Sequence, residues 1–207
     1  AAPPPKSDPS SSDGEEGSGD GRPTRDSHLN FGVSTMMERS FKSYQDKGYV
    51  TDSKCCRAGG SSVILKPKEG EIILFESFFL GGLRLPMSDF VDEVLEHFEV
   101  FLHQLTPNAF VQLNVFVWAL GSQGLQPSAE AFCRSHELHF QAKKDKETGL
   151  YPNFGCYSFK TQSGFAGPVV AYKSKWSTCW NQRWFYYRVG TEFRKEHKSV
   201  LIKPLRI

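Results

Sequence analysis

The sequence lacks the cysteine pattern of a zinc module or of a disulfide framework. Its 207 residues include 5 cysteines, an odd number, and no CxxC spacing repeats among them. The first residues, AAPPPKSDP, contain no apolar run of the kind that forms a secretory signal. We therefore expect an intracellular protein with reduced thiols, and the sequence does not distinguish nucleus from cytoplasm.

The common catalytic signatures are also missing. The chain has no GxxxxGK[ST], GxGxxG, GxSxG or HExxH motif and no EF-hand loop. It also has no zinc-knuckle spacing, no Asp-Thr/Ser-Gly of an aspartic protease and no Tyr-x-Asp-Asp polymerase turn. We therefore predict a protein that is not an enzyme and that binds no cofactor.

No apolar run is long enough to cross a membrane. The longest one, in QLTPNAFVQLNVFVWAL at 104–120, follows Thr106 as N-cap and Pro107 at the first helical position, and ends at Gly121. It is much shorter than the roughly 20 residues that span a bilayer. A helix that is apolar on nearly every side predicts a central core helix, with Phe116 and Trp118 among its buried side chains. A cofactor-binding stripe is the alternative, but no glycine-rich loop accompanies it.

Composition divides the chain into three parts. Residues 1–30 are rich in Pro, Ser and Gly and carry 3 basic and 6 acidic side chains, which predicts a disordered acidic tail. Residues 31–192 are expected to form one domain. Residues 193–207 are expected to be a basic C-terminal extension.

The periodicity within 31–192 predicts helices first and strands afterwards. Thr35 and Glu38 have capping-box spacing before a helix that stops at Lys47-Gly48, and a helical turn is expected to end near Gly81-Gly82. Ser88 is a predicted N-cap for an apolar face that continues to Leu105, and a further helix is predicted from Pro127 through Phe140.

Strands are predicted from short β-branched and aromatic runs. Two extended segments are expected in VILKPKEGEIILF, and an antiparallel sheet is expected from GCYSFK, PVVAY and RWFYYRV. The predicted fold class is therefore α+β, with a helical core and a small C-terminal antiparallel sheet.

One group of residues has the chemistry of metal ligands. Cys133, His136 and His139 are spaced i, i+3, i+6 in CRSHELH, which on a helix covers an arc of about 120°. That arc is too wide for one shared ion, and no fourth ligand is evident, so we predict no metal site. Cys156 and Cys179 have no local signature of a nucleophile and are predicted to be packed thiols.

A basic, aromatic segment is the candidate nucleic-acid site. Residues 141–207 hold 13 basic and 4 acidic side chains, a formal net charge of +9. Within YKSKWSTCWNQRWFYYRV, cations that pair with phosphates alternate with rings that stack on bases. The candidate residues are Lys173, Lys175, Trp176, Trp180, Arg183 and Arg188. The alternative is that the rings form the core of a small sheet while the cations are solvated.

Four ordered blocks resemble one known family. They are EGEIILFESFFLGGLRLPMSDFVDEVLEHF, HQLTPNAFVQLNVFVWAL, LQPSAEAFCRSHELHF and WNQRWFYYRV. Together, over about 31–190, they resemble the plant domain family known as the putative gypsy-type transposon, or transposase-like, domain. The resemblance implies an origin in a retrotransposon and gives no catalytic residue to carry over.

The resemblance also shows two departures. Relatives often have Gly where this chain has Glu99. Members typically continue into a longer region rich in coiled coil, whereas this chain ends at LIKPLRI, so the resemblance implies a truncated copy.

Three functions follow as hypotheses. The first is a non-enzymatic interaction or structural, gag-like domain that binds a protein partner or associates with itself, with no membrane contact. The second is a nucleic-acid-binding module that uses the basic, aromatic C-terminal third. The third is a metal-dependent transposase or nuclease, which would need a carboxylate triad, whereas the acids at 89–99 are expected to form a solvated helix face.

Overall fold

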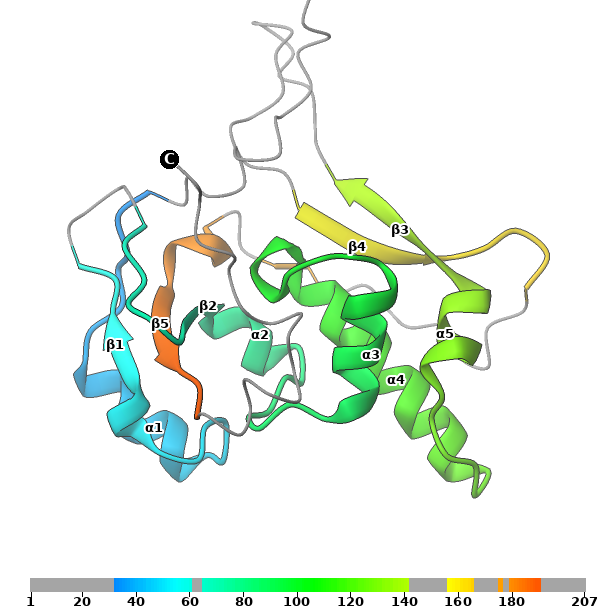
Figure 1. Ribbon diagram of the computed structural model, residues 1–207, viewed down its shortest axis with the longest axis horizontal. Coiled ribbons are helices and arrows are strands. Elements are labelled where there is room, and N and C mark those ends of the chain that lie inside the picture. Colours follow the sequence, from blue (N-terminus) through cyan, green and yellow to red (C-terminus); the bar gives the residue numbers. More distant parts are fainter. Residues whose placement is uncertain (1–31, 61–64, 142–155, 166–174, 177–178, 191–207) are drawn as a thin grey trace, which may run out of the picture.

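The computed structural model describes residues 32–60, 65–141, 156–165, 175–176 and 179–190. The predicted tail at 1–30, the extension at 193–207 and the predicted strand PVVAY lie outside these residues. The described residues form an α+β structure with antiparallel sheets, which confirms the predicted fold class. Figure 1 shows a three-stranded sheet with α1 at one end and a helical group with a two-stranded sheet at the other.

The elements follow one another along the chain with these bounds. The helices are α1 (Arg39–Asp46), α2 (Glu76–Leu80), α3 (Asp89–His97), α4 (Pro107–Ser122) and α5 (Ala129–Ser135). Short 3-10 turns occupy Ser53–Cys55, Leu102–Gln104 and Trp180–Gln182. The strands are β1 (Cys56–Ala58), β2 (Glu71–Phe75), β3 (His136–Gln141), β4 (Cys156–Thr161) and β5 (Trp184–Arg188).

The larger sheet joins the two halves of the chain. Its order is β1-β5-β2, and both outer strands are antiparallel to β5. Residues 184–187 of β5 are buried, so their backbone groups need partners on both edges, and β1 and β2 supply them. The predicted small antiparallel sheet thus takes only β5 from the C-terminal part, and its other two strands precede α3 and α4.

The smaller sheet corrects the prediction of a helix through Phe140. The helix α5 ends at Ser135, and β3 begins at His136 and pairs with β4, placing Leu138 opposite Phe159. Side chains of β3 alternate between buried or half-buried and exposed, which is the two-residue period of a strand. Pairing with β4, which is distant in sequence, favours the strand over a continued helix.

The start of α1 also differs from the prediction. Glu38 occupies the N-cap position, and Thr35 does not cap the helix. Instead, the backbone N–H and the hydroxyl of Thr35 both donate to the carbonyl of Gln182, at 2.9 and 3.2 Å. The helix ends where predicted, because Gly48 adopts a φ of +66° and Tyr49 N–H bonds back to the carbonyl of Tyr44.

The helix α3 is shorter than its apolar pattern predicts. It ends at His97, and Glu99 has a φ of +53°, the left-handed conformation that closes a helix. This is the position where the resembled family often has Gly, a residue that adopts positive φ without strain. The chain then turns through Leu102–Gln104 before α4 begins.

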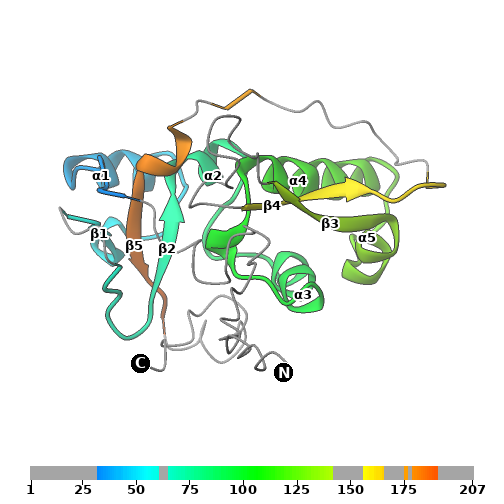
Figure 2. The same cartoon turned by 90° about the horizontal axis from the view of Figure 1, so that it is seen from above.

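The helices α2 and α4 pack closely against each other. The rings of Phe78 and Phe110 lie 4.5 Å apart, and a Cβ added to Gly81 would lie 2.6 Å from the Pro107 carbonyl. The amide of Asn114 donates to the Phe110 carbonyl at 2.7 Å and to the Gly81 carbonyl at 3.3 Å. Figure 2 shows α1, α2 and α4 in a row along one side of the molecule.

The burial of α4 confirms one part of its prediction and corrects another. Thr106 and Pro107 start the helix as expected, and Phe110, Leu113 and Phe116 are buried in the core. Trp118, predicted to be buried, is 66% exposed. The helix therefore has a core side and an open side, although its sequence is almost uniformly apolar.

Candidate interaction surfaces

Three of the six predicted nucleic-acid residues, Trp176, Trp180 and Arg183, contact other parts of the fold. Trp180 is half-buried, and its ring packs edge-on against Phe75 at 5.1 Å. Trp176 is also half-buried, and its Nε1 donates to Asn108 Oδ1 at 2.9 Å. Both rings thus contact other parts of the fold, which leaves each a smaller surface for stacking on a base.

The predicted cations lie in different surroundings. Arg183 forms an ion pair with Glu76, and Arg188 is exposed at the end of β5. Lys175 is exposed, and Lys173 lies outside the described residues. Binding of nucleic acid through the six candidate residues stays a prediction.

Arg183 belongs to a network that joins three elements. Glu76, the first residue of α2, accepts from the Tyr44 hydroxyl at 2.6 Å and from two nitrogens of Arg183. Burial raises the pKa of Glu76, but the hydrogen bonds and positive charge of Arg183, the Tyr44 hydroxyl and the charge of Lys47 outweigh it and lower the pKa. Burial and the Glu76 carboxylate raise the pKa of Tyr44. The network is therefore a fixed charge pair that ties α1 and α2 to the segment just before β5.

The residues considered as metal ligands do not share one helix. Cys133 lies on α5, whereas His136 and His139 lie on β3, so the helical arc assumed from the spacing is not formed. The His136 ring stacks on Phe132 with 4.1 Å between centroids, and burial lowers its pKa. Among the described residues, no three His, Cys, Asp or Glu side chains gather where a metal could bind.

Of the two cysteines predicted to be packed thiols, Cys156 is buried and Cys179 is exposed. Cys156 is buried, and burial raises its thiol pKa; Cys133 is also buried, and its pKa rises to about 11 for the same reason. Thiols with raised pKa values are poor nucleophiles near neutral pH. Cys179 is exposed, so the prediction of a packed thiol is wrong there.

The open side of α4 forms a surface that sequence reasoning missed. Val111, Val115 and Trp118 follow the i, i+4, i+7 spacing of one helix face; the two valines are half-buried and Trp118 is largely exposed. Leu125, which follows the end of the helix, is also exposed, at 56%. We name these four residues the Trp118 face.

The end of α4 fixes the position of Leu125. Gly124 has a φ of +70°, and the Leu125 N–H donates to the Leu120 carbonyl at 2.9 Å, which is the bond of a Schellman cap. This cap turns the chain so that Leu125 follows directly on the last turn of the helix. The Gly-Leu pair after the helix is the sequence signal that could have indicated this geometry.

The middle of the chain matches a known protein family. Residues 72–140 match the family described as "Putative gypsy type transposon". This transposon-family segment is about one third of the chain and runs from β2 through α4, which carries most of the Trp118 face, almost to the end of β3. The match confirms the resemblance over that range; neither the curated proteins nor the solved structures gave a match.

The transposon-family segment excludes the Trp-rich block that includes β5. The part of the family resemblance that rests on WNQRWFYYRV therefore stays an expectation, and so does the plant origin. None of the described helices is long and apolar enough to cross a membrane.

Proposed function

We propose that this protein is a non-enzymatic structural domain of a retrotransposon-derived protein and that it associates with copies of itself through the Trp118 face. The observation that carries the proposal is the exposure of Trp118 on a helix whose other side is core. Tryptophan is enriched among the residues that contribute most to protein interfaces, because one large rigid ring buries much apolar surface.

A second copy suits this face because α4 carries no charge. None of its residues, Pro107–Ser122, is Asp, Glu, Lys or Arg. Two identical charged faces would repel each other, whereas two uncharged, apolar faces meet without that cost. A symmetric pair of α4 helices would place each Trp118 against the partner copy's valines or Leu125.

The proposal that the domain is not an enzyme rests on the packing of its potentially reactive side chains. The thiols of Cys133 and Cys156 are buried with raised pKa values, and the His136 ring is stacked on Phe132 with a lowered pKa. These groups contribute to packing. A structural, gag-like role would depend on self-association through such a face. The match of residues 72–140 supports the transposon-derived part of the proposal.

Sedimentation velocity at protein concentrations of about 1 to 200 µM tests the proposal. The highest concentrations are included because small interfaces bind weakly. We expect the wild type to sediment faster as concentration rises and Trp118→Ser to remain a monomer with an unchanged circular dichroism spectrum. Leu80→Ser is the matched control, because Leu80 is also exposed, at 62%, but lies on α2. A monomeric wild type, or equal loss of association in both variants, would contradict the proposal.

A further inference from the structure

We propose that a second surface, independent of the Trp118 face, binds the sugar-phosphate backbone of nucleic acid. Its residues are Arg57 of β1, Lys66 and Lys68 of the turn before β2, and Arg188 of β5. Arg57 and Lys68 bond to Glu71, the first residue of β2, and Arg188 lies opposite it on β5. We name these four cations the sheet-end basic surface.

Glu71 organises this surface from inside. It is only 4% exposed, and its carboxylate accepts from Arg57 Nε at 2.9 Å, from a terminal nitrogen of Arg57 and from the Lys68 backbone N–H at 2.7 Å. The strand register places Arg188 directly opposite Glu71. Burial raises the pKa of Glu71, but these hydrogen bonds and the charges of Arg57 and Lys68 lower it overall, so the carboxylate stays ionised.

The same contacts hold the turn that carries the lysines. The Lys66 N–H donates to the Tyr186 hydroxyl at 2.9 Å, and the Lys66 carbonyl accepts from Arg57 at 3.3 Å. The Arg57 guanidinium lies 4.0 Å from the centre of the Tyr186 ring. The backbone of the turn is thus fixed from below, and its two lysine side chains are exposed.

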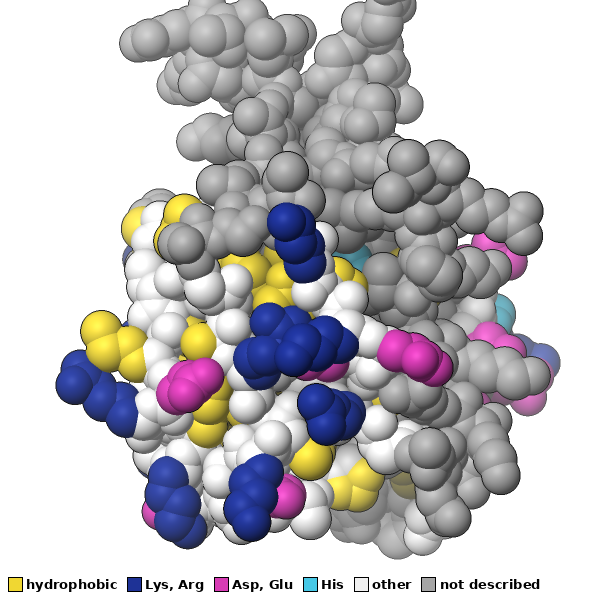
Figure 3. Space-filling model, turned by 60° about the vertical axis from the view of Figure 1, so that its left-hand side comes forward, with side chains coloured by type: hydrophobic (Ala, Val, Ile, Leu, Met, Phe, Trp, Pro, Cys, Tyr) yellow, Lys and Arg dark blue, Asp and Glu magenta, His cyan; other side chains and the backbone are white. Residues whose placement is uncertain are grey.

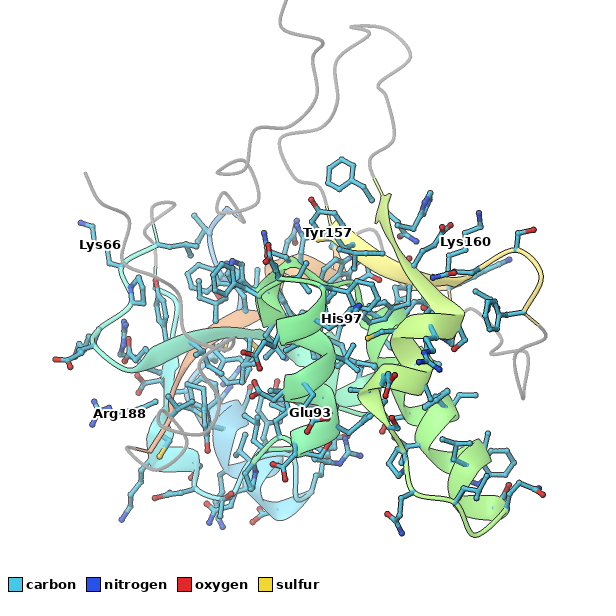
Figure 4. All side chains as sticks on the ribbon, turned by 45° about the vertical axis from the view of Figure 1, so that its right-hand side comes forward. Lys66, Glu93, His97, Tyr157, Lys160 and Arg188 are labelled. Atoms are coloured by element: carbon cyan, nitrogen blue, oxygen red, sulfur yellow. The ribbon has the colours of Figure 1, made fainter. Side chains whose placement is uncertain are left out.

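The charge balance of the surface is positive. Arg57 compensates the buried Glu71, which leaves Lys66, Lys68 and Arg188 in excess, with Glu69 as an exposed acid in the same turn. Figure 3 shows Lys and Arg side chains gathered on the face that includes this end of the sheet, with fewer acids among them. Figure 4 shows Lys66 and Arg188 on the same side of the molecule, Lys66 above Arg188 in this view, whereas Lys160 of β4 lies on the opposite side. The pairing of β1 and β2 with β5 therefore brings cations that are far apart in the sequence to one side of the molecule.

The side chains indicate which part of a nucleic acid would bind. Arg and Lys are the usual partners of phosphate oxygens, and Arg can form two hydrogen bonds at once. Tyr186 is buried beneath Arg57, so it cannot stack on a base. We therefore expect contacts to phosphates without base readout, so that duplex DNA and single strands of any sequence bind.

The test measures binding of a fluorescein-labelled 20-base-pair duplex by anisotropy over a salt series. The variant is Lys66→Ala/Lys68→Ala/Arg188→Ala, which leaves Arg57 in place to balance Glu71. Loss of three phosphate contacts should reduce the slope of log K against log salt by about 2.7. Affinity at 50 mM salt should fall by at least about tenfold, while the thermal melt changes little.

The matched control is Lys42→Ala/Arg134→Ala/Lys160→Ala. It removes the same net charge from exposed residues of α1, α5 and β4, and it should leave the salt slope unchanged. Equal effects in both triple variants, or no binding by the wild type at 50 mM salt, would overturn the proposal. Competition by polyglutamate as effective as by unlabelled duplex at equal charge would also overturn it, because the surface would then recognise acidic polypeptides.

Discussion

Replacing Glu76 by glutamine removes the carboxylate that joins α1, α2 and the segment before β5. Glu76 accepts hydrogen bonds from Tyr44 and Arg183, and glutamine keeps the shape but not the charge. Hydrogen bonds to charged groups contribute about 1.5 to 3 kcal/mol. Because the Arg183 side chain is 44% exposed and water screens its charge, we expect Glu76→Gln to lower the free energy of unfolding by about 1 to 2 kcal/mol at pH 7.

The effect should depend on pH in a defined direction. The pKa of Glu76 is lowered in the folded protein, so the folded state binds this proton more weakly than the unfolded state. The stabilisation is therefore present above the ordinary pKa of about 4.3 and is lost as pH falls through the lower folded value. Glu71, whose pKa is also lowered, titrates similarly in both proteins and cancels in their difference.

Urea unfolding followed by tryptophan fluorescence measures this difference. We expect the gap between wild type and Glu76→Gln to shrink between pH 7 and about pH 3. Lys42→Ala is the control, since it breaks an exposed i, i+4 pair with Asp46 and should cost less than about 0.5 kcal/mol. A loss below about 0.5 kcal/mol in Glu76→Gln at pH 7, or a gap equal at both pH values, would refute the reasoning.

Two further substitutions test the helix geometry. Glu99→Gly should raise the free energy of unfolding by about 0.5 to 1 kcal/mol, because Glu99 has a φ of +53° and glycine adopts that conformation without a Cβ clash; destabilisation would contradict the helix end at His97. Leu113→Ala should lower it by about 3 to 5 kcal/mol, because Leu113 is 1% exposed in the core; a urea midpoint close to that of the wild type would place this side of α4 outside the core.

Local patterns in the sequence predicted several elements correctly. Thr106-Pro107 marked the start of α4, Gly48 marked the end of α1, and the β-branched run EIILF marked β2. These signals act within a few residues of the chain. Capping and strand propensity are therefore enough to predict them.

The errors came from interactions between distant residues. The run HELHFQ fits both a helical and an alternating pattern, and only pairing with β4 selects the strand. The apolar pattern of α4 predicts a buried Trp118, but burial depends on which elements pack against each side of the helix. Local spacing contains neither kind of information.

The candidate surfaces show the same limit. The net charge of the C-terminal third predicts basic site residues there, whereas three of the four cations of the sheet-end basic surface precede residue 70. Only Arg188 was among the predicted residues. Strand pairing brings it beside the others, and a count of charge along the chain cannot show that pairing.

The most direct test of the proposed function is an isotope-filtered NOE experiment on a mixture of two differently labelled preparations. One preparation carries ¹⁵N and the other carries ¹³C-labelled methyl groups, so that only contacts between copies are detected. The account predicts NOEs from the Trp118 indole of one copy to methyl groups of Val111, Val115 or Leu125 of the other. Contacts between copies that involve only other surfaces, such as that around Leu80, would contradict it.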